Sequence, residues 1–139
     1  MKDYFRELTE IACWDGCDVL AHITCPMRRI QGKYAIDFDY SKISKETDEL
    51  LKTIIENNKS LEVNTSGLRQ MMARPMPEEN IIMRYKELGG KNITIGSDAH
   101  SAHDVGAGVY DCMKLVKKCG FEKINFYTGR EILEINNNV

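Results

Sequence analysis

The chain has 139 residues, 42% of them hydrophobic, and a net charge of −2 from 19 basic and 21 acidic side chains. This length predicts one compact domain with a buried core, and the ordinary hydrophobic content excludes disorder as a description of the whole chain. The slightly acidic balance argues against a nucleic-acid binder, and no apolar run approaches the roughly 20 residues of a membrane span. Because the first residues also lack signal-peptide character, we expect a cytoplasmic protein with neither nucleic acid nor membrane as a partner.

The five cysteines are an odd number and include no Cys-x-x-Cys pair, which indicates reduced thiols. Cys13, Cys17, His22 and Cys25 lie close together in the sequence and raise the question of a zinc site. Their spacing fits no structural zinc pattern. We therefore expect these cysteines to be small side chains of the core.

The first part of the chain combines helical and strand patterns. Apolar residues at helical spacing predict a helix over 3–14, and the short apolar run 18–23 is typical of a buried strand. Residues 26–44 are expected to be irregular. A second helix is predicted from Ser44, and Asn57 marks its end.

Similar units follow. A strand is predicted over 61–64, with a turn at Ser66-Gly67 and a loop rich in proline after it. A third helix is predicted to start near Pro77 and to stop at Gly89-Gly90. The run 92–95 is the next predicted strand.

The C-terminal part predicts one more unit and a tail. Asp104 is expected to be the N-cap of a helix that ends at Gly120, followed by a strand over 123–127 and a short tail helix. The repeated order strand, loop, helix predicts a single α/β block over residues 1–139, with about four parallel strands and flanking helices.

Polar residues stand where the predicted strands end. His22 closes the first strand, Glu62 and Asn64 lie at the end of the second, and Asp98 and His100 follow the third. In a parallel α/β sheet or barrel the carboxyl ends of the strands open onto one face, which carries the ligands. We therefore expect these five residues to meet at one edge of the sheet.

Asp98-Ala99-His100 is the strongest local signal, because a carboxylate and an imidazole just after a strand can reach one divalent cation. This pair suits Zn, Mn or Fe. The alternative is that Asp98 caps a turn and His100 lies on the surface. His22, taken alone, is more typical of a core histidine than of a ligand.

Glu62 has two readings. A carboxylate buried in a strand needs a partner, because burial disfavours its ionised form. Strand alternation can instead turn Glu62 outward, with Asn64 on the same face and Val63 inside.

Hydroxyl groups, loop amides and a guanidinium occur together in the loop after the second strand, which carries Ser66 and Arg69. This mixture suits an oxyanion, because arginine pairs with phosphate through a planar fork. Arg28 and Arg29, shortly after His22, can form a second clamp. The alternative for each arginine is a solvated loop.

Together these motifs resemble those of histidinol-phosphatases in the polymerase and histidinol phosphatase (PHP) family. The resemblance rests on VLAHITCPMR at 19–28, LEVNTSGLR at 61–69 and GSDAH at 96–100, in this order, with RPMP at 74–77 and RYKELGG at 84–90 in support. It covers nearly the whole chain.

The resemblance implies a distorted seven-stranded β/α barrel with up to three divalent metals (Zn, Mn or Fe) on its C-terminal rim. It assigns His22, Asp98 and His100 to the metals. It assigns Arg28 and Arg69, with Ser66 as a weaker neighbour, to the phosphate of the substrate, whereas Glu62 is expected to support the ligands. The reaction implied is hydrolysis of L-histidinol phosphate to L-histidinol and phosphate, in histidine biosynthesis.

The chain also departs from the family pattern. It has three histidines and no His-x-His, and the family's opening motifs precede the matched region. A β/α barrel generally takes about 250 residues. We therefore expect half a barrel: the C-terminal portion of a phosphatase, with an incomplete metal cluster and little or no activity by itself.

Two other functions stay open at this point. The half barrel can be a non-catalytic binding or assembly module, whose open sheet edge is covered by a second copy or by a missing N-terminal half. It can also be a PHP-type phosphoesterase with another substrate.

Overall fold

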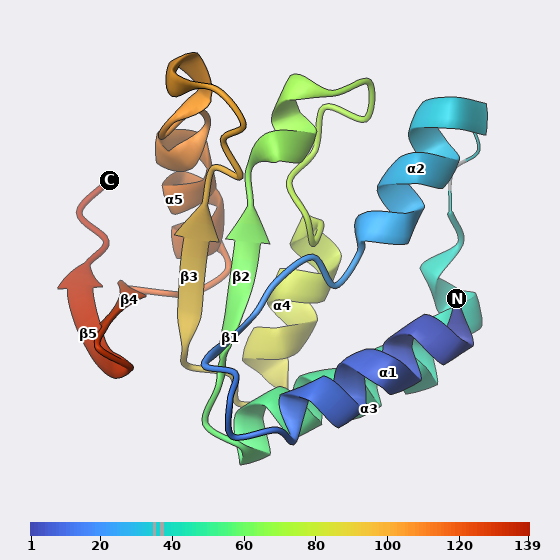
Figure 1. Ribbon diagram of the computed structural model, residues 1–139, viewed down its shortest axis with the longest axis horizontal. Helices are drawn as coiled ribbons and strands as arrows, with labels where there is room; N and C mark the ends of the chain where they lie inside the picture. Colours follow the sequence, from blue (N-terminus) through green and yellow to red (C-terminus); the bar gives the residue numbers. More distant parts are fainter. Residues whose placement is uncertain (35, 37) are drawn as a thin grey trace.

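The computed structural model describes residues 1–34, 36 and 38–139, and a parallel sheet of three strands organises it. The strands are β1 (Val19–Leu20), β2 (Ser60–Asn64) and β3 (Ile93–Gly96), in the order β1-β2-β3. Their carboxyl ends point the same way, toward the top of Figure 1. The α/β class is therefore confirmed, and the described strands do not close into a barrel.

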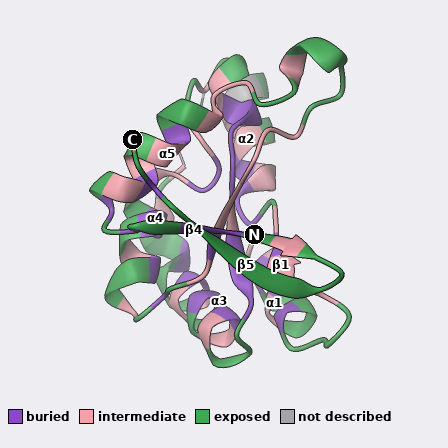
Figure 2. Ribbon diagram, turned by 90° about the vertical axis from the view of Figure 1, so that its left-hand side faces the viewer, coloured by how far each residue is buried: buried purple, intermediate pink, exposed green. Residues whose placement is uncertain are grey.

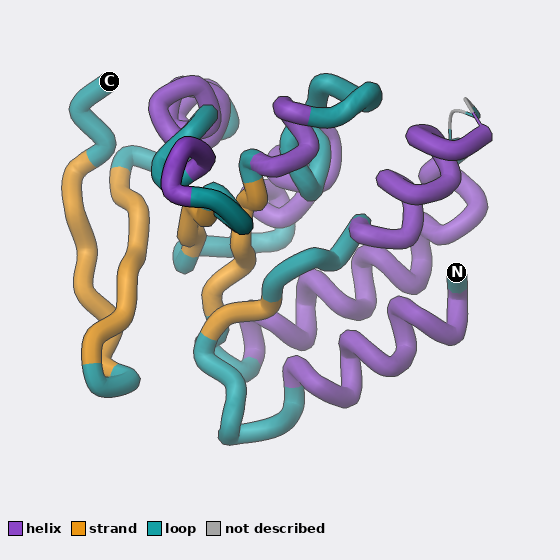
Figure 3. The backbone as a smooth tube through the Cα atoms, turned by 45° about the horizontal axis from the view of Figure 1, so that its top comes forward, coloured by secondary structure: helices purple, strands orange, loops and turns teal. Residues whose placement is uncertain are grey.

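Helices pack against this sheet because each has one apolar face. α4 (Glu79–Glu87) and α5 (Val109–Lys118) lie behind the sheet in Figure 1. α1 (Lys2–Ala12) and α3 (Ser44–Glu56) lie side by side, which Figure 3 also shows. Fully buried side chains from the strands and helices form one core, and they include Phe5, Leu50, Leu51, Ile54, Leu61, Val63, Ile82, Ile93 and Val116.

The segment expected to be irregular contains a helix. α2 (Cys25–Tyr34) begins directly after His22-Ile23-Thr24, and the short 3-10 helix η1 (Tyr40–Ile43) follows. The prediction for 26–44 was therefore wrong for most of its length, and its residues 35 and 37 lie outside the described part. Pro26 is the second residue of α2, where a missing N–H leaves no helical hydrogen bond unmade.

Asp104 does not cap a long helix. It ends the 3-10 helix η3 (Ala102–Asp104), and α5 starts after Gly108, whose φ is 75°. Gly106 also has a φ of 75°. Because two left-handed residues interrupt the segment, the helix cannot run on from Asp104, whose carboxylate instead accepts a hydrogen bond from the Ser101 hydroxyl at 3.0 Å.

The tail is a β-hairpin and not a helix. β4 (Lys123–Thr128) pairs with β5 (Glu131–Asn136) in antiparallel register. Gly129 and Arg130 form the turn with φ values of 56° and 69°, the double left-handed geometry that suits a two-residue hairpin. The predicted fourth parallel strand is thus the first strand of a separate two-stranded sheet.

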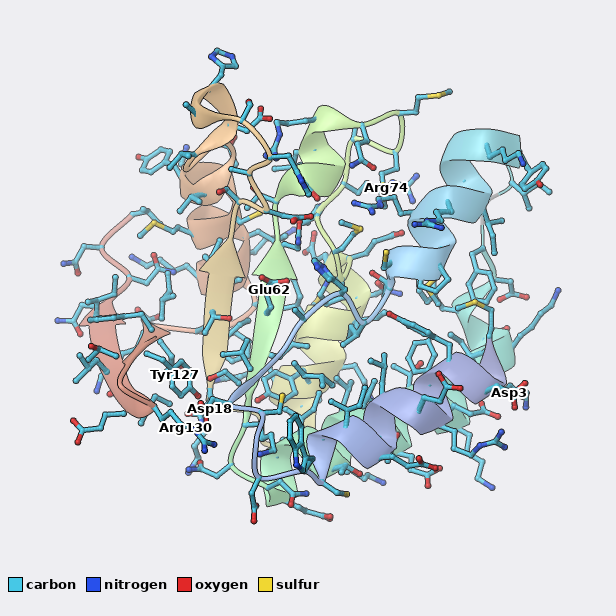
Figure 4. The ribbon with its side chains drawn as sticks, viewed as in Figure 1. Asp3, Asp18, Glu62, Arg74, Tyr127 and Arg130 are labelled. Atoms are coloured by element: carbon cyan, nitrogen blue, oxygen red, sulfur yellow. The ribbon has the colours of Figure 1, made fainter. Side chains whose placement is uncertain are left out.

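The hairpin contacts the start of each parallel strand through side chains. It lies in front of the sheet in Figure 2, and Figure 4 labels Tyr127, Asp18 and Arg130 where its turn meets the strands. The side chain of Asn125 accepts a hydrogen bond from the backbone N–H of Ile93, at the start of β3, at 2.7 Å. The Tyr127 and Ser60 hydroxyl groups lie 2.8 Å apart at the start of β2. Arg130 binds both carboxylate oxygens of Asp18, just before β1, at 3.0 and 2.9 Å.

The hydrogen bond to Ile93 gives a test of this attachment. Replacing Asn125 with alanine leaves the buried Ile93 N–H without an acceptor, which we expect to reduce the free energy of unfolding by about 1–3 kcal/mol. Urea denaturation of the variant measures the change. Asn136→Ala, on the exposed strand β5, is the matched control, and equal losses in the two variants would contradict the prediction.

Candidate functional site

The predicted residues meet at the carboxyl edge of the parallel sheet. His22 lies just beyond β1, Asn64 ends β2, and Asp98 follows β3. Glu62 and Asn64 share one face of β2, and Val63 faces the other way and is fully buried. The Glu62 side chain is nevertheless only 18% exposed and has His22 and Asn64 as neighbours, so it is a largely buried carboxylate with partners. Figure 4 shows Glu62 on β2, near the middle of the sheet.

Asn64 is the centre of the polar contacts at this edge. Its side-chain oxygen accepts hydrogen bonds from the Ser66 N–H at 2.9 Å and from the Ser66 hydroxyl at 2.6 Å. Its amide nitrogen lies 3.4 Å from a Glu62 oxygen and 3.3 Å from Nδ1 of His22. The Ser66 Oγ also lies 3.2 Å from a carboxylate oxygen of Asp98. One network therefore joins the ends of all three strands.

The two predicted arginines reach the same place from different segments. Nη1 of Arg28, on α2, lies 3.5 Å from Ser66 Oγ. Arg69, at the end of the 3-10 helix η2 (Ser66–Arg69), donates to the carbonyl oxygen of Ser97 at 2.8 Å and pairs with Asp104 at 3.3 Å. Arg69 thereby ties the turn after β2 to the loop after β3.

A cleft of about 430 Å³ opens between these groups. Its lining combines two arginines with carboxylates, a hydroxyl, an amide and an imidazole. The lining residues are Arg28, Ser66, Arg69, Gln70, Asp98, His100 and Asp104. Five of the six residues proposed from the sequence for metal or phosphate lie in this cleft, and the sixth, His22, joins it through Asn64.

The donors for a metal ion come together in part. Nε2 of His100 lies 3.4 Å from a carboxylate oxygen of Asp98, so this pair can face one cation, whereas Nδ1 of His22 faces Asn64 and Glu62. Within the described part of the chain, no three His, Cys, Asp or Glu side chains are close enough to hold a metal ion. A zinc site in a protein takes three or four protein ligands. The residues present are thus of the right chemical kind and too few for a complete site.

Two of the site residues have left-handed backbone conformations. The φ of His22 is 60° and that of Asp98 is 48°. For a residue with a side chain this conformation costs about 1–2 kcal/mol, and such strain gathers at functional sites. The Tyr4 hydroxyl helps to hold His22 by donating to its carbonyl oxygen at 2.8 Å.

The two carboxyl groups of the network differ in acidity. Burial raises the pKa of Glu62, and the nearby charge of Asp98 acts in the same direction. Burial also acts to raise the pKa of Asp98, but hydrogen bonds from Asn64 and Ser66 outweigh it and lower that pKa. Asp98 is therefore the stronger acid and the ready anionic donor of the pair.

Sequence reasoning missed several contributors. Asn64 had been noted at a strand end, but nothing in the sequence marked it as the centre of the network. The sequence predicts Asp104 as a helix cap, whereas its contact with Arg69 depends on how the fold brings the two loops together.

The expectation that the cysteines near His22 belong to the core was wrong for Cys13, which is exposed, whereas Cys17 and Cys25 are half-buried. Cys25 lies 3.6 Å from Nη2 of Arg28, and Cys112 and Cys119 are buried. His103 is exposed.

No protein-family model matches the chain. A probable histidinol-phosphatase of Thermotoga maritima is 35% identical over 103 residues, which are 74% of this chain and 41% of the relative. A probable histidinol-phosphatase of Clostridium acetobutylicum is 31% identical over 126 residues, which are 88% of this chain and 48% of the relative.

A solved structure agrees in fold. The crystal structure of histidinol phosphate phosphatase from Lactococcus lactis, complexed with zinc, L-histidinol and phosphate, superimposes with a TM-score of 0.72 and 20% identity. The superposition covers 95% of this chain and 50% of that one. The chain therefore shares the α/β fold of about half of that structure.

The sequence matches specify which proteins the chain is related to. The chain is homologous, over part of their length, to histidinol-phosphatases of the PHP family. It spans about half the length of the relatives that it matches. In addition, no helix in the described ranges is long and apolar enough to cross a membrane.

Gly96 tests the packing of Glu62 at this edge. A Cβ at position 96 would lie 2.5 Å from Oε1 of Glu62, so Gly96→Ala must displace that carboxylate. Because that oxygen is the far end of a flexible side chain, we expect the free energy of unfolding to fall by about 1 kcal/mol, the lower end of the range for overpacking. The loss should shrink markedly in the background Glu62→Ala, where the obstacle is gone. Chemical denaturation of the two single variants and the double variant measures the coupling, and additive losses would contradict the contact.

Proposed function

We propose that this chain carries the phosphate-binding part, and some of the metal ligands, of a metal-dependent phosphomonoesterase site resembling that of histidinol-phosphatase. The substrate is L-histidinol phosphate, which water cleaves to L-histidinol and phosphate. The observation that carries the proposal is the meeting of Arg28, Ser66 and Arg69, from two segments, in one cleft with Asp98 and His100.

The guanidinium groups in the cleft can bind an anion. Arg28 has guanidinium hydrogens left over from its contacts with Ser66 and Cys25, and Arg69 holds the opposite wall through Ser97 and Asp104. A guanidinium binds phosphate through two parallel hydrogen bonds, which fix its orientation as well as its position. The two arginines therefore bind and orient the phosphate, and Asp98 lies beside it.

The metal ligands contributed by this chain are His22, Asp98 and His100. A divalent ion such as Zn, Mn or Fe supplies Lewis acidity and a bound water of lowered pKa in enzymes of this kind. Because the described residues bring only Asp98 and His100 together at one point, the chain's own residues complete no such site, and we assign no hydrolytic step to them. The isolated chain is then a binder of phosphate with little or no phosphatase activity.

The second candidate function is an assembly module without catalysis. All six residues of β5 are exposed, and Phe126, Leu133 and Ile135 of the hairpin are exposed apolar side chains. A strand edge of this kind can pair with another chain. A dimer of defined mass in solution, with no affinity for phosphate, would favour this module over the phosphatase.

Phosphate binding gives the direct test. Titration of the chain with inorganic phosphate, followed by isothermal calorimetry and by the amide NMR signals of Ser66 and Arg69, should show saturable binding at the cleft. Arg28→Ala should weaken it by about 10- to 100-fold, because a hydrogen bond to a charged group is lost. Arg29→Ala is the control, since Arg29 is exposed and does not line the cleft. Equal effects of both substitutions would argue against the assignment.

A chimera tests the substrate. The isolated 139-residue chain should release no phosphate from L-histidinol phosphate above background. In a chimera, the matching part of this chain replaces the corresponding 103 residues of the Thermotoga maritima relative. This chimera should hydrolyse L-histidinol phosphate in the presence of a divalent metal. Asp98→Asn in the chimera should abolish that activity. Hydrolysis by the isolated chain at an enzymatic rate would contradict the expectation that its site is incomplete.

A further inference from the structure

The two arginines of the cleft differ in their partners. Arg28 contacts Oγ of Ser66 at 3.5 Å and Sγ of Cys25 at 3.6 Å, and it forms no ion pair with any residue that the structure describes. Nε of Arg69, by contrast, lies 3.3 Å from Oδ1 of Asp104. The charge of Arg28 is therefore open to an incoming anion, whereas the charge of Arg69 already faces a carboxylate.

Neutral groups, and not Asp104 alone, hold Arg69 in its place. Nη2 donates to the carbonyl oxygen of Ser97 at 2.8 Å and lies 3.5 Å from that of Asp98. Nη1 lies 3.4 Å from the carbonyl oxygen of Ala107. These carbonyl groups carry no net charge, so they fix the guanidinium without neutralising it. Asp104 is the partner that neutralises it.

The pair of Arg69 and Asp104 is loose. In the pair of Arg84 and Asp48, elsewhere in the chain, two guanidinium nitrogens donate to two carboxylate oxygens at 2.8 and 2.6 Å. In the cleft only Nε approaches the carboxylate, and 26% of the Arg69 side chain and 30% of the Asp104 side chain are exposed. Water competes for both charges of such a pair, so it contributes little to stability. A stronger anion can therefore replace the carboxylate.

Asp104 keeps a partner when it leaves Arg69. Its Oδ2 accepts a hydrogen bond from the Ser101 hydroxyl at 3.0 Å, and its exposed part can be hydrated. The exchange thus leaves no buried charge unpaired, which would be strongly unfavourable. A phosphate group carries more negative charge than a carboxylate, and Arg28 and Arg69 line the same cleft. Phosphate is therefore the stronger partner for this guanidinium.

We propose that Asp104 is the internal counter-ion of the phosphate site: it pairs with Arg69 in the empty cleft and gives way to the phosphate group of the ligand. The inference deepens the proposed function and rests on it, because it concerns the same cleft. Asp104 is then a residue that determines affinity. The cleft holds phosphate less tightly than its two arginines alone would, which favours release of the phosphate product.

Asp104→Asn removes the charge and keeps the shape of the side chain and an oxygen that can accept from Ser101. Calorimetric titration with inorganic phosphate at low ionic strength should give a Kd about 3- to 10-fold lower than that of the wild-type chain, because no carboxylate competes for Arg69. Asp111→Asn is the matched control, since Asp111 is exposed on α5 and does not line the cleft. An unchanged Kd in Asp104→Asn, or an equal gain in Asp111→Asn, would overturn the inference.

A double-mutant cycle separates exchange from simple repulsion. If Asp104 acts by pairing with Arg69, the gain from Asp104→Asn should shrink in the background Arg69→Gln, where no pair remains to be broken. If Asp104 only repels phosphate through its charge, the gain is the same in both backgrounds. Equal gains would therefore overturn the exchange.

The Nε–H NMR signal of Arg69 follows the exchange directly, and it decides the question if Arg69→Gln does not fold or binds too weakly. Without phosphate, this signal should differ between the wild-type chain and Asp104→Asn, because one has a carboxylate partner and the other does not. At saturating phosphate the two signals should coincide. Signals that stay apart at saturation would show that Asp104 remains on Arg69, against the inference.

The two proposals fail in different ways. If neither the wild-type chain nor Asp104→Asn binds inorganic phosphate, the proposed function falls, and the role of Asp104 falls with it. If phosphate binds and depends on Arg28 while Asp104→Asn has the wild-type Kd, the function stands and only the role of Asp104 falls.

Discussion

The parallel pairing of β2 with a neighbour on each side is the constraint on which the site depends. β1 and β3 are aligned to β2 by backbone hydrogen bonds, in a register that sets Asn64 beside Gly96 and Leu20 beside Leu61. The residues that follow each strand therefore leave the sheet at nearly the same level. His22, Ser66 and Asp98 become neighbours for that reason, although up to 76 positions separate them, since 98 − 22 = 76. A shift of register by one residue would turn Glu62 and Asn64 into the core and Val63 into the site.

Sequence could predict the place of the site because this rule of parallel sheets needs only strand ends and polar residues. The residues proposed for metal or phosphate include Arg28, Ser66, Arg69, Asp98 and His100, and these five line one cleft. Sequence reasoning did not single out Asn64 as the centre of the polar contacts, because those contacts depend on the direction that an amide faces. That direction is fixed by a single backbone N–H, and no spacing or composition records it.

The errors in the fold have equally local causes. Residues 131–136 place isoleucine and leucine where either a short helix or a strand can use them, and the decision falls to the Gly129-Arg130 turn. Arginine is an unusual residue in a left-handed turn position, so the hairpin signal was weak. The helix expected from Asp104 failed for a related reason, because Gly106 and Gly108 take left-handed conformations that a capping pattern does not reveal. In both cases one or two φ values outweighed the periodicity of the side chains.

The hairpin that contacts the starts of the three strands has a consequence for the order in which this molecule can form. Asp18, just before β1, and Arg130 are 112 positions apart, so their ion pair is among the contacts with the largest separation in the sequence. A chain emerging from the ribosome has made β1, β2, β3 and every cleft residue before Arg130 exists. β1 therefore lacks the ion pair with Arg130 until the rest of the chain has been synthesised. Contacts between residues so far apart in the sequence form slowly. The ion pair between Asp18 and Arg130 can therefore form only after the strands and the cleft residues have been synthesised.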